Sequence, residues 1–526
     1  MILTLVFVVS GCALLPYTGF QNDESLFASG IYEKWGIADT LQAGKRQIPL
    51  MLMSYVGALK SWIYTPIFQW FPPNLWSVRL PVVLLGAATL WLLHRFLCRV
   101  SRPRTAFIAL ALLATEPTNL LTTTFDWGPV ALQHFLGVGG MAALAAFAQT
   151  TRTRYLVLGF GAFGLGMWDK ALFAWFLSGV ALAAMVTVPG QILRLVTFRR
   201  TAIAFASFFI GALPLLLYNT RYPFATFQGT SGFSLKDAWG KAAVFQSSLN
   251  GSALFGYIPR DNAEPESQRP PSSLLERMAF RLDEATGGQN QTWGVKAAVV
   301  AVLLLPWLWF TSSRQLAFFS AAAIAVGWIQ MAATNNAGGS AHHCVLLWPL
   351  PQILVAAALG EIAGRFRAGL IVASIAAAAL FCLNTLVLNH HLVLLVRNGP
   401  TAIWSDAILT LSDTLAGIPA KEIYLNDWGL MDSVRMAKRG SLPLRVGSDP
   451  LSKPDLSPED IQTVTGRLKA DNLFVAFTDG NEVFAGVNRK MGQIAETAGF
   501  KHRSVVYIKD RNGRTLIEVF RYLPDE

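Results

Sequence analysis

The chain opens with an uncharged apolar run, MILTLVFVVSGCALLPY (Met1–Tyr17), followed at once by TGFQNDESLFASGIYEKWG (Thr18–Gly36). A run of this length can cross a hydrocarbon core of about 30 Å as a helix. The first charges after it are two adjacent acids, Asp23 and Glu24. They could simply favour the positive N-terminal end of a helix. Because they stand where the first span ends, they could also form part of an active site at the membrane boundary.

The apolar pattern continues through most of the chain. Of its 526 residues, 53% are hydrophobic and 14% are charged, whereas a soluble protein carries about a quarter charged residues. The deficit falls on repeated apolar runs of about 17 to 23 residues, which can span a membrane. We therefore expect a mainly α, polytopic membrane protein with about 11 transmembrane helices, centred near residues 10, 87, 112, 138, 160, 180, 210, 303, 325, 351 and 379.

Lysine and arginine occupy alternate short loops. The net charge of +11 does not gather on one soluble face, so it indicates membrane topology and not nucleic-acid binding. Basic short loops stay on the cytoplasmic side. The N-terminus is therefore expected inside and the C-terminal tail outside, with these arginines in the cytoplasmic loops: Arg95, Arg99, Arg102, Arg104, Arg152, Arg154, Arg194, Arg199, Arg200, Arg314, Arg365 and Arg367.

The polar groups that could perform acid–base or phosphate chemistry all emerge on the opposite side of the expected membrane. A scattered set would indicate structural roles, whereas a set on one side predicts a single outward-facing site. The members are Asp23, Glu24, Glu116, Asp126, Asp169, Lys170, His342 and His343.

Two outer segments are long, residues 18–76 and 219–293. In the first, Phe27, Ile31 and Trp35 recur at helical spacing and predict an interfacial helix, with Asn22 as its N-cap. The second contains a proline-rich patch and basic residues, among them Arg260 and Arg269.

From about His390 the composition becomes that of a soluble domain. The segments EIYLND, NLFVAF, SVVYIKD and RTLIEVFRYL predict strands, with a hairpin turn at residues 511–513. We therefore divide the chain into a transmembrane domain, 1–389, and an outer α/β domain, 390–526. No motif in the second domain carries recognisable chemistry.

Other patterns favour simple packing. GFGAFG (Gly159–Gly164) matches a dinucleotide motif, but it lies inside an expected span and is better explained by close helix packing. The four cysteines show no paired or metal-type spacing. Adjacent histidines such as His342 and His343 point about 100° apart on a helix and are a poor pair for one metal ion.

Four stretches give the chain a resemblance to the GT-C class of membrane glycosyltransferases. The acids Asp23 and Glu24 follow the first span, and Asp126 in TTFDWGPVAL stands at the outer start of the fourth. GMWDKALF resembles a lysine-containing outer turn, although Asp169 and Ala171 depart from the usual residues. AHHCVLLWPLPQ resembles the opening of a late span. Within the class, the chain looks most like the branch of protein O-mannosyltransferases and lipid A aminoarabinose transferases.

The resemblance implies an enzyme that takes a sugar from a polyprenyl phosphate and transfers it, with inversion, to an outer hydroxyl of a lipid, glycan or protein. Asp23 would be the base, with Glu24 and Asp126 as further catalytic acids. Substrate contacts would come from Lys170, Asp169, Glu116, Arg260, Arg269, His342 and His343. No cofactor is required, and a divalent metal between Asp23 and Asp126 stays open. The location would be the bacterial inner membrane, with the site on the periplasmic face.

Two other hypotheses remain at this point. A transporter or flippase of lipid-linked sugars predicts ionisable residues near the bilayer midplane and two related halves. We find no such halves, and the charges lie at the ends of the spans. A non-catalytic assembly protein would leave the outer acids dispensable.

Overall fold

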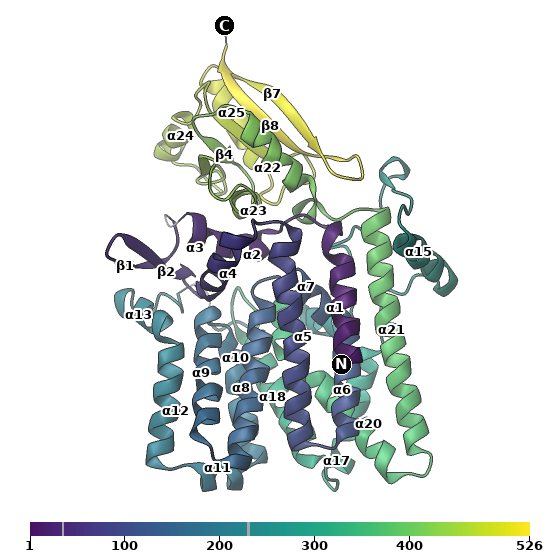
Figure 1. Cartoon of the computed structure of the whole chain (residues 1–526). Coiled ribbons are helices and arrows are strands. Elements are labelled where there is room, and N and C mark those ends of the chain that lie inside the picture. The colour runs from purple at the N-terminus through teal and green to yellow at the C-terminus, as the bar shows by residue number, and fades with distance from the viewer. Residues whose placement is uncertain (34–35, 229–231, 526) are drawn as a thin grey trace.

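The computed structural model describes residues 1–33, 36–228 and 232–525. Within them the chain forms a bundle of roughly parallel and antiparallel helices with an α/β domain seated over one end (Figure 1). We call that end of the bundle the domain end. The long helix α21 (Gly369–Arg397) runs towards it (Figure 1).

Every centre expected for a membrane span lies within a helix. The bundle consists of α1 (Ile2–Leu14), α5 (Leu75–Val100), α6 (Pro103–Thr115), α7 (Pro117–Thr124), α8 (Val130–Thr150), α9 (Thr153–Asp169), α10 (Phe173–Thr187), α11 (Pro189–Leu195), α12 (Phe198–Gly211), α13 (Leu213–Arg221), α16 (Gly294–Leu303), α17 (Leu305–Leu308), α18 (Arg314–Ala333), α20 (Leu350–Arg365) and α21 (Gly369–Arg397).

Several of these helices are broken. In the described part of the chain, four helices are long and apolar enough to cross a membrane alone, and up to nine spans result if each bent pair counts as one. Proline begins the second helix at two of the breaks, at Pro117 and Pro189, because proline lacks the N–H that would continue the first helix. The number of 11 spans therefore stays a prediction.

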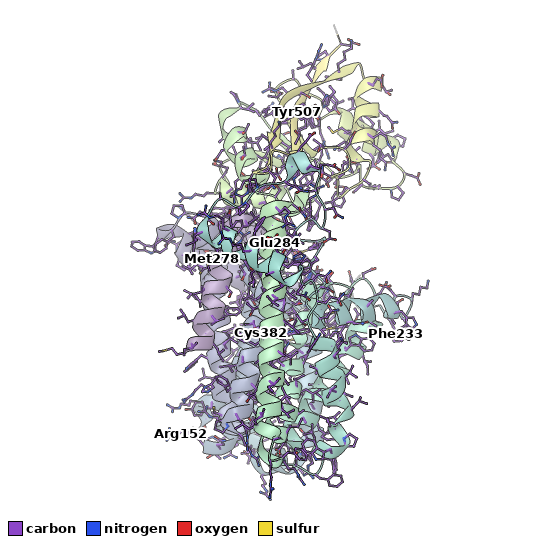
Figure 2. All side chains as sticks on the ribbon, turned by 90° about the vertical axis from the view of Figure 1, so that its right-hand side faces the viewer. Arg152, Phe233, Met278, Glu284, Cys382 and Tyr507 are labelled. Carbon is purple, nitrogen blue, oxygen red and sulfur yellow. The ribbon has the colours of Figure 1, made fainter. Side chains whose placement is uncertain are left out.

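The two kinds of short loop lie at opposite ends of the bundle. Arg102 pairs with Glu361 at 3.6 Å, the backbone of Arg99 binds Gln149, and Arg200 lies over the Phe147 ring, so the arginine-rich turns gather together. Arg152 lies at the end of the molecule far from Tyr507 of the α/β domain (Figure 2). This separation agrees with the loop alternation in the sequence.

The first long segment is more folded than expected. After the turn η1 (Leu15–Tyr17), it forms the short helices α2 (Asn22–Ser25), η2 (Leu26–Ala28) and α3 (Ser29–Tyr32), a three-stranded sheet of β1 (Asp39–Ala43), β2 (Arg46–Met53) and β3 (Val56–Gly57), and helix α4 (Leu59–Trp70). The direction changes by 108° between α1 and the α2–α3 segment, which therefore lies across the bundle.

Two expectations for this segment need correction. The N-cap is Gln21 and not Asn22, because the Gln21 side chain accepts the backbone N–H groups of the first turn. Phe27 does not face the interface. It is 2% exposed and packs on Tyr64 of α4 at 4.5 Å between ring centroids. Trp35, the third residue of the expected stripe, lies outside the described residues.

The second long segment folds into α14 (Ala238–Leu249), η3 (Pro265–Ser267) and α15 (Leu274–Thr286). Helix α15 packs beside the last turns of α21. The histidine segment forms α19 (Ala341–Cys344) and η4 (Val345–Leu347), directly before α20.

The α/β domain follows the end of α21 at Arg397, so the expected boundary at residue 389 falls inside that helix. Its five-stranded sheet has the order β5-β4-β6-β8-β7. The strands are β4 (Ile423–Leu425), β5 (Leu444–Val446), β6 (Leu473–Phe477), β7 (Phe500–Lys509) and β8 (Thr515–Pro524). The helices of the domain are η5 (Ala402–Trp404), α22 (Ala407–Gly417), α23 (Met431–Ala437), α24 (Pro458–Thr465) and α25 (Val487–Thr497). The four strands expected from sequence are present, and β5 was not expected.

The domain shares one hydrophobic core with the first long segment. Phe20 and Phe27 belong to the same buried cluster as Leu411 of α22 and Val434 of α23. Ser25 of α2 and Ser433 of α23 are both fully buried, with their hydroxyl oxygens 3.1 Å apart. The α/β domain is therefore built onto the segment that carries Asp23.

Candidate active site

The turn between α7 and α8 brings the polar groups of the domain end together. Three consecutive residues, Asp126, Trp127 and Gly128, each meet a different partner. Asp126 and Gly128 have positive φ angles of 41° and 73°. A non-glycine residue rarely adopts this conformation, and such strain is concentrated at functional sites. Here the conformation turns three successive side-chain positions towards different groups.

Asp23 lies on α2 and is held by this turn. The indole Nε1 of Trp127 donates to Asp23 Oδ2 at 2.9 Å. Burial raises the pKa of Asp23, and the Lys170 ammonium and the Trp127 hydrogen bond oppose the shift without cancelling it. The net direction is upward, so Asp23 holds a proton more tightly than an exposed aspartate does.

Asp126 is fixed by two contacts. Its Oδ2 lies 2.5 Å from Nζ of Lys60 on α4, in an ion pair whose side chains are 8% and 2% exposed. Its Oδ1 accepts the backbone N–H of Ala131 at 3.1 Å, at the start of α8. Lys60 also donates to the backbone oxygen of Glu24 at 3.1 Å. This lysine therefore links α4, the α2 segment and the strained turn.

Lys170 stands at the end of α9 and is 4% exposed. Its backbone pairs with Val56 of β3 in an isolated bridge, which ties the turn to the first long segment. A methyl group added to Gly128 would lie 3.2 Å from Lys170 Nζ and 3.3 Å from the His342 ring. Within residues 1–33, 36–228 and 232–525, the ammonium has no ion pair within 4 Å. It is therefore a buried cation beside the site with capacity for an anion.

Asp169 is 1% exposed, and neither carboxylate oxygen has a hydrogen-bond partner in the described part of the chain. It interacts electrostatically with Asp126, Lys60 and Lys170. An unpaired buried carboxylate is costly. Its position beside two lysines makes it a candidate for contact with a polar ligand.

An aromatic wall borders Asp23. Trp127 stacks on Tyr257 with ring centroids 4.5 Å apart and lies 4.4 Å from the His342 ring. Trp404, from the start of the α/β domain, packs edge-on against Trp127 at 6.1 Å. Burial and the Asp23 charge raise the pKa of Tyr257, so this phenol keeps its proton. The wall thus combines apolar faces with neutral polar edges.

Glu24 has a different environment from its neighbour. Both of its carboxylate oxygens bind Arg79 of α5, at 2.6 and 2.8 Å, and both residues are fully buried. The same guanidinium donates to the backbone oxygens of Leu15, Thr18 and Gly19. Glu24 therefore holds the α1–α2 corner in place, and the structure gives it no contact with Asp126 or Lys170.

Three further candidates are not brought to this site. Glu116 caps α7 and accepts from Trp348 Nε1 at 2.8 Å. Arg269 pairs with Glu276 of α15 at 3.2 Å, and the Arg260 backbone binds Gly399. His343 does lie beside the site, since its ring centroid is 4.2 Å from that of His342, and its Nδ1 accepts the N–H of Gly338 at 3.2 Å.

Four residues with contacts described above are not predicted from the sequence, namely Lys60, Arg79, Trp127 and Tyr257. Lys60 and Arg79 carried a usable signal, because each is a lone charge within an otherwise apolar stretch. Trp127 is adjacent to Asp126, but nothing in the sequence indicates that its indole reaches α2. Tyr257 lies in the second long segment, and only the tertiary fold brings it to Trp127.

No group of three or more histidine, cysteine, aspartate or glutamate side chains suited to a metal ion occurs within the described ranges. At Asp126 the ammonium of Lys60 already occupies the position of a cation. The residues present therefore do not fit a divalent ion bridging Asp23 and Asp126.

The sequence matches no protein-family model and no curated protein. Solved structures nevertheless share its fold. ArnT from Cupriavidus metallidurans bound to undecaprenyl phosphate is 14% identical, with a TM-score of 0.56 over 98% of this chain and 96% of that chain. The Archaeoglobus fulgidus oligosaccharyltransferase tethered with an acceptor peptide is 10% identical, with a TM-score of 0.53 over 99% of this chain and 74% of that chain.

A third structure, AglB from Archaeoglobus fulgidus with an inhibitory peptide and a dolichol-phosphate, is 10% identical, with a TM-score of 0.51 over 99% of this chain and 74% of that chain. These neighbours are polytopic membrane glycosyltransferases of the GT-C class. The resemblance predicted from the motifs around Asp23, Asp126 and Lys170 is therefore confirmed at the level of the fold. The chain is a multi-pass membrane protein with the GT-C fold.

Proposed function

Because the chain has the GT-C fold, we propose that it is a membrane glycosyltransferase, which transfers a sugar from a polyprenyl-phosphate donor to an acceptor hydroxyl. The domain end would face the outside of a bacterial inner membrane. The observation that carries the proposal is the meeting of Asp23, Asp126 and Lys170 at one strained turn at that end. A site at the boundary between membrane and water suits a donor whose lipid lies in the bilayer and whose sugar lies in water.

Lys170 is the proposed phosphate ligand. Its ammonium is buried, and no carboxylate of the described residues lies within 4 Å of it. Both this ammonium and the His342 ring lie close to Gly128. Negative charge on the phosphate grows as the glycosidic bond breaks, and a fixed cation in a water-poor site stabilises that change. Asp169, whose two carboxylate oxygens have no hydrogen-bond partner among the described residues, is the proposed contact for a polar group of the donor sugar.

Asp23 is the proposed general base. The acceptor oxygen attacks the anomeric carbon as the bond from that carbon to the phosphate oxygen breaks, and Asp23 accepts the hydroxyl proton. The polyprenyl phosphate leaves, and attack opposite the leaving group inverts the anomeric centre. The raised pKa of Asp23 makes it a stronger base than an exposed aspartate. Asp126 would act indirectly, by fixing the turn that carries Trp127.

Metal dependence is a separate question. One structure of the Archaeoglobus fulgidus oligosaccharyltransferase is a complex with Zn and sulfate. In this chain Lys60 occupies the cation position at Asp126, so no step is assigned to a metal. Activity that survives extensive chelation agrees with this assignment, whereas loss restored by one divalent ion would reverse it.

The test is a transfer assay with purified full-length protein in vesicles. A panel of polyprenyl-phosphate sugars is offered with lipid, glycan and peptide acceptors, and products are followed by mass spectrometry. We expect Asp23→Asn to lower kcat by about 10²–10⁴-fold, the usual contribution of a general base, with unchanged membrane insertion. Lys45→Met, which changes an exposed side chain in the turn between β1 and β2, serves as the control variant.

Two results would overturn the proposal. Undiminished transfer by Asp23→Asn would remove Asp23 as the base. Failure of the wild type with every donor, combined with donor movement across the vesicle without an acceptor, would favour a flippase of lipid-linked sugars. A flippase would also tolerate Asp23→Asn.

A further inference from the structure

Helix α15 (Leu274–Thr286) has three distinct faces. Buried residues Glu276, Ala279 and Asp283 form the first, with 4%, 5% and 6% exposure. Four exposed apolar residues form the second, namely Leu274, Leu275, Met278 and Leu282. Arg277, Arg281 and Glu284 are exposed on the third. With about 100° per residue, the centres of the three faces lie roughly 120° apart.

The buried face is the polar one, which reverses the usual order of a surface helix. Asp283 Oδ1 binds His390 Nδ1 of α21 at 2.8 Å. Glu276 accepts from Ser272 and pairs with Arg269. Hydrogen bonds from Ser272 and the Arg269 charge outweigh burial and lower the pKa of Glu276 to about 2, so the anchor is ionised at neutral pH. Large apolar side chains thus point away from the protein, at 67% exposure for Leu274 and 61% for Met278.

The height of α15 along α21 indicates what covers this apolar face. Asn389 of α21 donates to the backbone oxygen of Ala279 at 2.9 Å, and Arg397 lies over the Phe280 ring. These contacts fall near the end of the mainly apolar stretch of α21, where Asn389 and His390 follow. Figures 1 and 2 place α15 beside this upper part of α21, on the outside of the bundle. The helix therefore lies level with the polar end of an expected span.

We propose that α15 docks on the bilayer at the domain end, with Leu274, Leu275, Met278 and Leu282 among the acyl chains and Arg277 and Arg281 on lipid phosphates. The three faces then meet protein, hydrocarbon and headgroups, which is the arrangement of a helix lying in a membrane interface. Arginine stems can reach from an immersed helix to the phosphate level. Anionic lipids such as phosphatidylglycerol would bind more strongly than zwitterionic ones.

Docking would also hold the chain that enters the candidate site. Tyr17, the last residue of η1, donates its hydroxyl to Glu276 Oε1 at 3.1 Å. The α2 segment with Asp23 begins directly after this anchor. Docking of α15 would therefore also anchor the chain just before the corner between α1 and α2.

The depth of α15 can be measured with a spin label in the full-length protein. Met278→Cys is labelled in a background without the native cysteines and reconstituted in phosphatidylglycerol-containing nanodiscs. We expect relaxation by oxygen and protection from a water-soluble nickel chelate. Glu284→Cys on the charged face is the matched control and should show the opposite pattern. Arg277→Gln with Arg281→Gln should move the Met278 label to a shallower depth.

Each other outcome contradicts the proposal. Equal nickel access at positions 278 and 284 would place the apolar face in water. Protection from both agents at 278 would indicate protein cover, by a second copy or a soluble partner. If the cysteine-free background does not fold, benzoylphenylalanine at position 278 of the otherwise native chain decides the matter. A cross-link to phospholipid agrees with docking, and a cross-link to protein alone overturns it.

Discussion

Asp23 experiences two opposing influences, and its pH dependence should reveal both. Burial raises its pKa, and the Lys170 ammonium lowers it. A general base must be deprotonated, so transfer should rise with pH through a pKa above the ordinary value of about 3.9. In Lys170→Met the opposing cation is absent, so the acid limb of kcat/KM should move to higher pH, together with a lower rate. The comparison is the full pH profile of both proteins.

The matched control for this prediction is Lys45→Met, which removes an exposed lysine from the turn between β1 and β2. Its acid limb should coincide with that of the wild type. A limb that moves to lower pH in Lys170→Met would contradict the electrostatic assignment, because loss of a cation cannot favour the carboxylate.

Gly128 allows the strained turn to approach Lys170. Its φ angle is 73°, and an added methyl group would meet Lys170 Nζ at 3.2 Å. Gly128→Ala should therefore lower unfolding stability by about 1–3 kcal/mol and reduce transfer more than stability alone explains. Thermal unfolding in detergent and the transfer assay provide the two measurements.

Gly190→Ala is the control for Gly128→Ala, since a methyl group there meets nothing within 4 Å. Its helical position predicts an unchanged or slightly higher melting temperature. Equal melting temperatures for the two variants would show that the turn accommodates a side chain.

Among the elements, α2 depends most on its surroundings. It contains 4 residues, and a single turn is not stable alone. The buried ion pair between Glu24 of α2 and Arg79 of α5 fixes α2 to the bundle. Glu24→Gln and Arg79→Met should each destabilise the protein by about 3–5 kcal/mol, because each leaves a buried polar group without its partner. The double variant should lose much less than the sum.

A double-mutant cycle on thermal stability gives the coupling between these residues. Additive losses would contradict the clamp. A Glu24→Gln variant with native stability and a much lower kcat would instead support the catalytic role first expected for Glu24.

Helix α23 holds α2 from the other side and carries a titrating group. Burial raises the pKa of Asp432 to about 6, with Arg435 acting against the shift and Glu33 and Asp23 adding to it. The folded protein therefore binds this proton more tightly than the unfolded chain. Between about pH 4 and pH 6, stability should fall as the pH rises. Asp432→Asn should flatten this part of the stability profile.

The control for Asp432 is Asp413→Asn, an exposed side chain on α22. Its profile should retain the wild-type slope between the same pH values. An unchanged slope in Asp432→Asn would show that another group titrates in this interval.

At the scale of the whole molecule, we expect the α/β domain and the first long segment to fold together, because they share a core. Phe20, Phe27, Leu411 and Val434 share a buried cluster. A chain that ends after Arg397 exposes this cluster, so we expect aggregation and loss of a monodisperse gel-filtration peak. A short glycine–serine insertion at Gly480, where added atoms meet no neighbour, is the control and should be tolerated. A monodisperse truncated bundle would contradict the shared core.

The sequence by itself determined the membrane class, the helical segments of the bundle, its two ends and four of the five strands of the α/β domain. Apolar length, loop charge and alternation are local properties, so they can be read without knowing what lies nearby. The motif resemblance added the fold, and it also brought Asp23, Asp126 and Lys170 into one hypothesis. Glu24, Glu116 and Arg269 looked equally suitable in sequence.

Only the tertiary structure decided which of these polar groups meet. It paired Asp126 with Lys60, Asp23 with Trp127 and Glu24 with Arg79, residues up to 104 positions apart. A buried charge requires a partner, and that partner comes from whichever distant segment packs beside it. A single sequence contains the charges without this packing, so the members of the site could be proposed from sequence while their contacts could not.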